Sequence, residues 1–317
     1  MIKIFANWLT YGILSITPDT LLAEAVNFFI YDIIKIFLLL ISIIFTISIL
    51  RTFLAPEKIR NILARKNKYF GNILAALFGI ATPFCTCSAI PLFLGFLRAG
   101  VPLGATFSFL VSSPMINEVA MIMLFGMFGW RIALIYVFSG LIIAIISGII
   151  IGKLKVENLL KDFVYENKAV IENKTSKISW KERTAYAKGY TIEILKRVWI
   201  YIVIGVGIGA WIHGYVPTDF LAKYAGADKW YAVPFATLIG IPLYSNAAGI
   251  IPLVGAFTKK GVSIGTALAF MMAVTALSLP EFMILRTVMK TKLIIIFASV
   301  VGIGIIFTGY LFNLIIK

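Results

Sequence analysis

The two cysteines of the chain, Cys85 and Cys87, are the residues best suited to chemistry, and they lie one residue apart inside a long apolar segment. Thiolates are soft ligands that bind thiophilic species such as trivalent arsenic or Cu(I). A Cys-X-Cys pair is too close for an ordinary unstrained disulfide. The two thiols could therefore contact a thiophilic solute, or they could be small buried side chains that only fill space.

The residues around the cysteines predict a break in the helix that the apolar segment would otherwise form. Pro83 and Pro91 lack backbone donors, and Thr82, Thr86 and Ser88 add hydroxyl groups. In a bilayer, non-helical backbone is tolerated only where it is buried in protein or lines a water-filled cavity. We therefore expect a broken helix or hairpin whose tip binds the substrate. The predicted lining residues of this tip are Thr82, Pro83, Cys85, Cys87 and Ser88.

Two further polar breaks interrupt apolar segments downstream, and each carries a carboxyl group. The first lies around Ser112–Glu118 and the second around Thr275–Glu281. An ionisable group inside a membrane segment is costly, and by default it suggests a function. Glu118 and Glu281 could exchange a proton during transport, or each could pair with a buried arginine or with backbone amides. Additional polar lining is predicted at Ser112, Ser113, Asn117 and Ser278.

The composition indicates which class of protein must position these groups. Hydrophobic residues make up 61% of the 317 residues, charged residues make up 14%, and the mean hydropathy is +0.98. A soluble protein of this length cannot bury so much apolar surface. Stretches such as Ile33–Leu50 and Leu293–Ile316 are close to the roughly 20 residues that cross a hydrocarbon core. The sequence therefore predicts an all-α, polytopic membrane protein.

The chain contains an internal repeat, because it matches itself when it is displaced by 161 positions. Ile90-Pro91-Leu92 then meets Ile251-Pro252-Leu253, and Gly79-Ile80 meets Gly240-Ile241. Glycine and proline contribute many of the matches, and these residues fix unusual backbone conformations. The repeat therefore predicts two structurally related halves.

The basic residues predict how the halves cross the membrane. Loops rich in Lys and Arg lie on the cytoplasmic side, and residues 51–68 and 153–190 are both strongly basic. The three apolar blocks between them would place the two loops on opposite sides, unless the cysteine segment enters and leaves by the same face. Each half then has one helix, one re-entrant or broken-helix hairpin and two further helices. Because three crossings is an odd number, the second half is inverted relative to the first.

The expected organisation is an N-terminal interfacial and helical segment at 1–31, a first transmembrane repeat at 32–152, a cytoplasmic linker at 153–190 and a second transmembrane repeat at 191–317. In the second repeat, Tyr244, Ser245 and Asn246 lie opposite the cysteine motif, with Asn246 at the position of Cys85. If the two tips meet near the midplane, they form a substrate site with thiols on one side and polar groups on the other. Alternatively, Ser245 and Asn246 only cap the broken helix ends.

Other classes of function have less support. The formal charge of +15 reflects Lys and Arg at the ends of apolar segments, so we expect no nucleic-acid partner. A zinc or iron–sulfur site needs about four ligands, and the chain has a single histidine, His213, so we expect no metal centre and no cofactor. No Walker A pattern occurs. Arg98 and Arg131 are expected at the membrane interface, with their charged heads in water.

The motif Thr82-Pro83-Phe84-Cys85-Thr86-Cys87-Ser88 with Pro91, together with Gly100–Gly104 and Ser112–Asn117, resembles the predicted-permease family that includes the ArsP organoarsenical exporters. The resemblance extends from about Ile33 to Ile316. It implies a permease of the cytoplasmic membrane and, in ArsP-type members, export of trivalent organoarsenicals, with Cys85 and Cys87 contacting arsenic. No further cysteine is present to complete a three-thiol site.

The predicted function is a secondary-active permease, not an enzyme, that moves a small solute through a midplane site formed by the two hairpin tips, with a thiophilic, organoarsenical-like solute as the candidate. Its expected partners are membrane lipid and the solute, and the chain could also form a homo-oligomer. A channel or the membrane subunit of a larger complex is one alternative. A thiol–disulfide oxidoreductase is another, although the single-residue spacing of the cysteines argues against it.

Overall fold

The computed structural model describes residues 2–18, 20–51, 68–82, 86–161, 179–215, 229–243 and 247–316. Within these ranges the chain is helical apart from turns and one isolated β-bridge between Leu160 and Met289. Four described helical stretches are long and apolar enough to cross a membrane, and the bent pair formed by α6 and α7 would make a fifth. The chain is therefore an all-helical, multi-pass membrane protein.

The helices of the first half follow a short N-terminal segment. That segment consists of α1 (Ile2–Asn7) and the π-helix η1 (Trp8–Ile13), and it packs against α2. The helices of the first half are α2 (Leu21–Arg51), α4 (Lys68–Ile80), α5 (Thr86–Arg98), α6 (Leu103–Met115), α7 (Glu118–Phe128) and α8 (Trp130–Lys153).

The second half has the same order of elements. Its helices are α11 (Trp180–Tyr215), α13 (Ala232–Gly240), α14 (Ala247–Lys259), α15 (Ile264–Ala276), α16 (Leu279–Leu285) and α17 (Thr291–Ile315). A short 3₁₀ helix, η2 (Glu157–Leu159), follows α8. The predicted boundary at 31/32 falls inside α2, and α11 begins ten residues before the predicted end of the linker.

The shift of 161 positions that relates the two halves of the sequence also relates the first and last residues of equivalent helices. Adding 161 to both ends of α5 gives the bounds of α14, and the same shift converts α6 into α15. Close helix contacts repeat as well. A Cβ on Gly104 would collide with the carbonyl of Gly148, and a Cβ on Gly265 would collide with that of Gly309. Both halves therefore use glycine at the same place to bring two helices together.

The two halves pack against each other in reciprocal pairs. Helix α2 contacts its equivalent α11, α6 contacts α15, and α8 contacts α17. Helix α5 contacts α16, while the equivalents of these two helices, α14 and α7, also contact each other. The two halves thus contact each other largely through equivalent helices.

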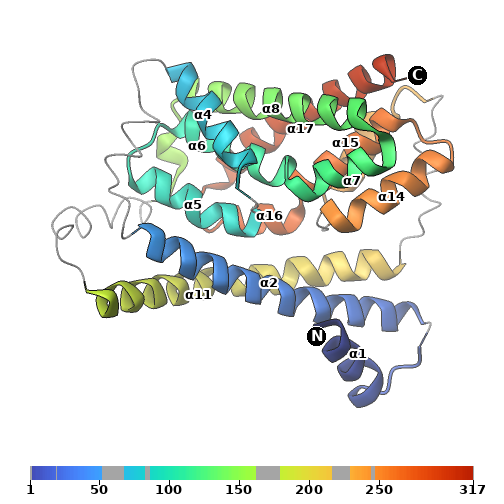
Figure 1. Ribbon diagram of the computed structural model, residues 1–317, viewed down its shortest axis with the longest axis horizontal. Helices are drawn as coiled ribbons and strands as arrows, with labels where there is room; N and C mark the ends of the chain where they lie inside the picture. Colours follow the sequence, from blue (N-terminus) through green and yellow to red (C-terminus); the bar gives the residue numbers. More distant parts are fainter. Residues whose placement is uncertain are drawn as a thin grey trace.

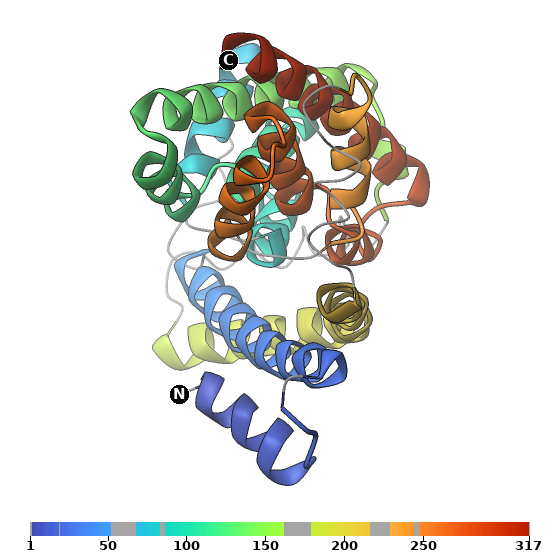
Figure 2. The same ribbon diagram turned by 90° about the vertical axis from the view of Figure 1, so that its right-hand side faces the viewer.

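Helices α2 and α11, which are equivalent in the two halves, lie side by side and run in opposite directions (Figure 1). The start of α17 lies beside the residues that follow α8, because the Lys290 amide donates to the Leu159 carbonyl at 2.8 Å, and the Lys290 ammonium donates to the Asn158 carbonyl at 3.0 Å. Figure 2 shows that the α2–α11 pair forms a separate layer beside the body of the remaining helices.

Helices α4 and α5 are the two short helices that precede α6. The Lys153 ammonium at the end of α8 lies 5.9 Å from the centroid of the Tyr69 ring at the start of α4. Helix α4 then runs alongside α6, since Gly79 faces Ser112. Helix α5 returns to a tight turn at Gly100 (φ 77°), which leads into α6. Both α4 and α5 therefore pack on α6.

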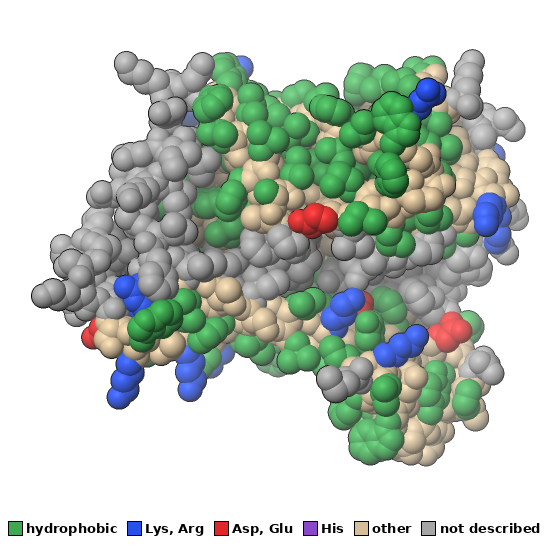
Figure 3. Space-filling model, in the orientation of Figure 1, with side chains coloured by type: hydrophobic (Ala, Val, Ile, Leu, Met, Phe, Trp, Pro, Cys, Tyr) green, Lys and Arg blue, Asp and Glu red, His purple; other side chains and the backbone are tan. Residues whose placement is uncertain are grey.

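Apolar side chains cover much of the body surface. Figure 3 shows hydrophobic side chains over most of the described surface of the upper body in that view. Several large ones on α8 and α17 are well exposed, including Phe138 (60%), Ile303 (68%) and Phe307 (68%). Such a surface is stable only in contact with lipid or another apolar surface, and it agrees with a position in the cell membrane.

Candidate functional site

The predicted tip residues are only partly within the described chain. Pro83, Cys85, Tyr244, Ser245 and Asn246 lie outside the described residues. Cys87 and Ser88 lie in the first turn of α5, and their side chains also fall outside the described part. Thr82 is placed at the end of α4, where its hydroxyl donates to the carbonyls of Phe78 and Gly79, both at 3.0 Å. The Thr82 hydroxyl thus satisfies carbonyls at the end of the helix.

Four short helices begin where the chain is broken. Helices α5 and α14 begin after the breaks that follow α4 and α13, while α7 and α16 begin at the two downstream breaks. Backbone N–H groups at a helix start are unpaired within the helix, and the helix dipole makes this end positive. The start of α16 is buried, since Ser278 is 2% exposed and Glu281 is 1% exposed, whereas Glu118 at the start of α7 is partly exposed.

The second hairpin and the second break are directly connected. The Leu279 amide at the start of α16 donates to the Ile241 carbonyl just after α13, at 2.7 Å. Helix α16 also contacts α5, which begins at the first hairpin tip, and α11 in the outer layer. Helix α16 thus contacts a helix of the first half, and its first turn is hydrogen-bonded to the segment that follows α13.

The first break is closed by hydrogen bonds. Asn117 is the N-cap of α7, and its side-chain oxygen accepts from the Ala120 amide at 2.7 Å. The Tyr136 hydroxyl of α8 donates to the Met115 carbonyl at the end of α6, also at 2.7 Å. Glu118 is the first residue of α7 and is partly exposed. Its position suits a carboxylate, which the positive end of a helix stabilises.

The second break is closed less completely. Ser278 is the N-cap of α16, but its side chain makes no capping hydrogen bond. Pro280 follows at a position where the missing N–H costs nothing. Glu281 is only 1% exposed, and neither carboxyl oxygen has a hydrogen-bond partner among the described residues. The prediction of a carboxyl group inside the body thus fits Glu281, whereas Glu118 is only partly buried.

Two of the predicted lining serines lie inside α6. Ser112 and Ser113 are fully buried in α6. The Ser112 hydroxyl donates to the Phe109 carbonyl at 3.2 Å, and a methyl group on Gly79 would collide with the Ser112 oxygen. Ser112 thus lies in the contact between α4 and α6.

Sequence reasoning missed one residue and misplaced another. Tyr136 is completely buried, and its hydroxyl also contacts Thr275 of the other half. Its only sequence signal is a single phenol in an apolar helix. Arg98 is expected to hold its charged head in water, but its side chain is 8% exposed and its Nε and Nη2 are buried. The ring of Tyr190 in α11 covers it, with 5.5 Å between the guanidinium carbon and the ring centroid. Arg131 is exposed at the start of α8, as predicted.

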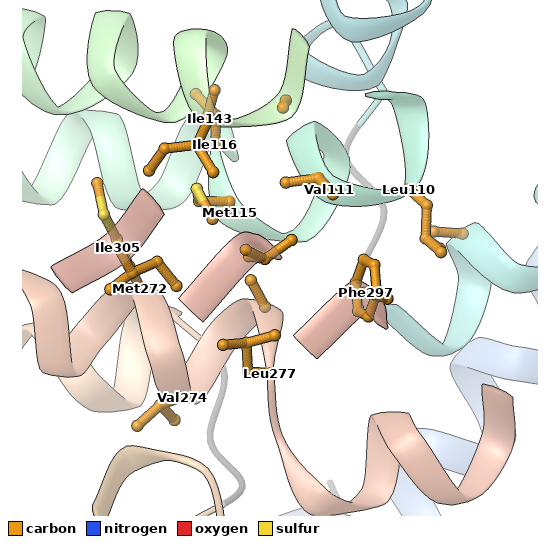
Figure 4. Close-up of a cluster of buried hydrophobic side chains, with 14 of the residues drawn as sticks. Leu110, Val111, Met115, Ile116, Ile143, Met272, Val274, Leu277, Phe297 and Ile305 are labelled. Atoms are coloured by element: carbon orange, nitrogen blue, oxygen red, sulfur yellow. The ribbon is translucent and has the colours of Figure 1, made fainter. Parts of the chain in front are cut away.

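The contact between the two halves is apolar at its centre. Figure 4 shows Leu110, Val111, Met115, Met272, Leu277 and Phe297 among the side chains that fill this region. Phe107 of α6 lies 5.8 Å from Phe297 of α17 between ring centroids. Among the described residues, no group of three or more His, Cys, Asp or Glu side chains could hold a metal ion.

Comparison with known proteins identifies the family. The family ArsP_1, described as a predicted permease, matches residues 21–314. The UPF0718 protein MJ0584 of Methanocaldococcus jannaschii is 24% identical over 299 residues, which cover 74% of this chain and 81% of that protein. A protein of Streptococcus mutans called a putative two-component membrane permease complex subunit is 26% identical over 255 residues, with coverage of 79% and 82%.

A further relative comes from a second bacterium. The UPF0718 protein YraQ of Escherichia coli is 22% identical over 247 residues, covering 77% of this chain and 68% of the relative. No solved structure matches the chain. Because the family match covers nearly the whole sequence, including all the helices that form the breaks, the chain belongs to the predicted-permease family.

Proposed function

We propose that this protein is a secondary-active permease that moves a small, thiophilic solute past the two hairpin tips. The observation that carries this proposal is the meeting of broken helices from both halves: α16 contacts α5, and the Leu279 amide of α16 donates a hydrogen bond to the Ile241 carbonyl. Secondary transporters commonly place the substrate between discontinuous helices of two repeats. The membership in a permease family supports the same function.

We further propose that the halves have inverted orientations in the membrane and that the hairpins are re-entrant. Two observations support this arrangement: α2 and α11 run in opposite directions, and the start of α4 and the end of α5 lie at the same end of the body. Lys153, Lys290 and Lys292 lie near that end and mark it as the cytoplasmic side. The N-terminal residues up to about 31 and the linker 153–190 then connect or flank the two repeats.

The proposed substrate contacts follow the chemistry of the two tips. Cys85 and Cys87 would offer thiols to a soft centre such as the arsenic of a trivalent organoarsenical. Thr82, Pro83 and Ser88 would line the same tip, and Tyr244, Ser245 and Asn246 would supply polar groups on the other. Ser112, Ser113, Asn117 and Ser278 would lie behind them at the breaks. No bond of the solute is made or broken, so the proposal is transport without catalysis.

The test is uptake of a trivalent organoarsenical into everted membrane vesicles. Phenylarsine oxide is a suitable probe, and the variants are Cys85→Ser, Cys87→Ser and the double replacement. We expect wild-type vesicles to accumulate the probe only with an ion gradient. We expect uptake by the double variant to be at least tenfold lower than uptake by the wild type. Ser147→Ala, at a buried site in α8 away from the tips, is the control and should retain uptake. Unchanged uptake in the double variant would contradict a role for the thiols.

A second candidate function has one specific observation in its favour. The Streptococcus mutans relative is called a subunit of a putative two-component membrane permease complex. Under this alternative, the present chain would transport only with a partner protein. Purified protein that accumulates the probe alone in liposomes would exclude the need for a partner, whereas passive equilibration without regard to the gradient would indicate a channel.

A further inference from the structure

Glu118 and Glu281, the two residues predicted to exchange a proton during transport, have different environments. Glu118 is the first residue of α7, is partly exposed, and lies at the positive end of this 11-residue helix. Glu281 lies in the first turn of α16 and is 1% exposed. Its equivalent in the first half, 161 positions earlier, is Ala120. A buried carboxyl group therefore occupies a position that is apolar in the other half.

Polar partners of Glu281 are scarce. The backbone of Ser278 faces the carboxyl group, yet neither carboxyl oxygen makes a hydrogen bond within 3.5 Å among the described residues. An anion in such a place loses its hydration without compensation. A neutral carboxyl group costs much less to bury, so the enclosure seen in the structure suits the protonated form.

The elements packed on α16 contribute few charges that could compensate an anion. Helix α11 packs Gly205 against Pro280, and in this part of α11 no charged residue occurs between Arg197 and His213, with Tyr201 as the titratable side chain. Helix α5 carries Cys87 in its first turn and Arg98 at its opposite end.

Two nearby segments complete the surroundings of Glu281. The described residues of the segment around Ile241 carry no titratable side chain, and Tyr244, which follows Leu243, lies outside the described residues. On α16 itself, Glu281 is the acidic residue, and Arg286 follows the end of the helix in an exposed position.

We propose that Glu281 is the proton-carrying residue of this protein and that Glu118 is not. One proton from water binds a carboxylate oxygen of Glu281 when the start of α16 is open, stays there while the site is enclosed, and returns to water on the other side. A metal cation would require several oxygen ligands around it, whereas a proton requires only the carboxyl group. The link between this proton and solute movement rests on the proposed function.

The position of Glu281 allows its protonation state to affect both halves. A charged Glu281 must gain water or a polar partner, which requires α16 to separate from α11, from α5 or from the Ile241 segment. Helix α11 belongs to the outer layer, α5 carries Cys87, and the Ile241 segment follows α13 in the second half. Loss of the proton therefore favours opening at the place where the two tips would meet.

The first experiment tests protonation and needs no solute. Dicyclohexylcarbodiimide reacts with protonated carboxyl groups in apolar surroundings, and mass spectrometry locates the product. With full-length protein in membrane vesicles, we expect Glu281 to be labelled at least tenfold more than Glu118 at pH 6. The labelling should decrease as the pH rises, and 100 mM Na⁺ at constant pH should not protect the site.

Variants make this result specific. Glu281→Gln should remove the label, Glu281→Asp should retain a pH-dependent label, and Glu118→Gln should leave labelling of Glu281 unchanged. Preferential labelling of Glu118, or an unreactive Glu281 in a folded protein whose exposed carboxyl groups react with a water-soluble carbodiimide, would overturn the proposal. Protection by Na⁺ would also overturn it, because it would identify a cation site.

The second experiment separates this inference from the transport proposal. In liposomes loaded with phenylarsine oxide and its dithiol complex, the Glu281→Gln variant should still exchange phenylarsine oxide across the membrane. Its accumulation of phenylarsine oxide driven by a pH gradient should be at least tenfold lower than that of the wild type. Glu118→Gln should retain both. If the wild-type protein moves no probe while Glu281 is labelled as expected, the transport proposal fails and the proton site stands. If Glu281→Gln accumulates the probe like the wild type, the coupling role fails although transport stands.

Discussion

The first and second halves share a backbone plan but close their breaks with different side chains. In the first half, Asn117 caps α7 and the Tyr136 hydroxyl binds the end of α6. In the second half, the residue equivalent to Tyr136 is Phe297, which has no hydroxyl, and the N-cap Ser278 makes no side-chain bond. The repeat therefore preserves the helix ends while it distributes polar groups unequally.

This comparison shows which features the fold requires and which are left for function. Close helix contacts at glycine occur in both halves and hold the same helices together. Thiols occur in one tip and a buried carboxyl group at the opposite break. Features present twice fit a structural role, whereas features present once are the ones that can bind a solute or an ion in a single place.

The largest effect is expected from filling the repeated glycine contacts. Gly148→Leu and Gly309→Leu should each destabilise the protein by about 3 kcal/mol or more, since overpacking costs 1–3 kcal/mol even without a backbone collision. A side chain on either glycine would meet neighbouring atoms of α6 or α15. Thermal unfolding in detergent measures the loss.

Gly126→Leu serves as the control for this pair. A Cβ on Gly126 would meet no atom within 4 Å, so its unfolding temperature should be nearly that of the wild type. A large loss at Gly148 with none at Gly309 would contradict the structural equivalence of the two contacts.

An intermediate effect is expected from the phenol that is present in the first half alone. Tyr136→Phe should reduce stability by about 1–3 kcal/mol, because a buried carbonyl of Met115 loses its donor. Tyr310→Phe is the matched control, since its hydroxyl binds the Trp230 carbonyl at a more exposed site and should matter less. Chemical denaturation in mixed micelles compares the two variants, and an equal effect would show that burial does not set the cost.

The smallest effect is expected at the helix caps. Asn117→Ala should cost about 1 kcal/mol, the usual value for loss of an N-cap side chain. Ser278→Ala should cost much less, because Ser278 makes no capping bond with its side chain. Native-state hydrogen exchange of the first turns of α7 and α16 measures both effects locally. If Ser278→Ala increases the exchange rate in α16 more than Asn117→Ala increases it in α7, the predicted difference between the two breaks is wrong.

The sequence was sufficient to predict the helical class, the repeat and the positions of the breaks. These features depend on apolar length and on glycine and proline, whose effects are local. The burial of Arg98 could not be predicted, because it depends on Tyr190 from a helix that begins 82 residues later in the chain, at Trp180. The difference between Glu118 and Glu281 also depends on packing, since both carboxyl groups follow a similar polar segment.

Reciprocal pairing of the helices has a consequence for assembly. A surface that meets its own equivalent is complete after two units and leaves no free copy to extend the array. Each half thus saturates the inner surface of the other, and α6 and α15 are covered within a single chain. A homo-oligomer would have to use the outer faces of helices such as α8 and α17, where Phe138 and Phe307 are exposed. Subunits joined there would each keep their own contact between α6 and α15.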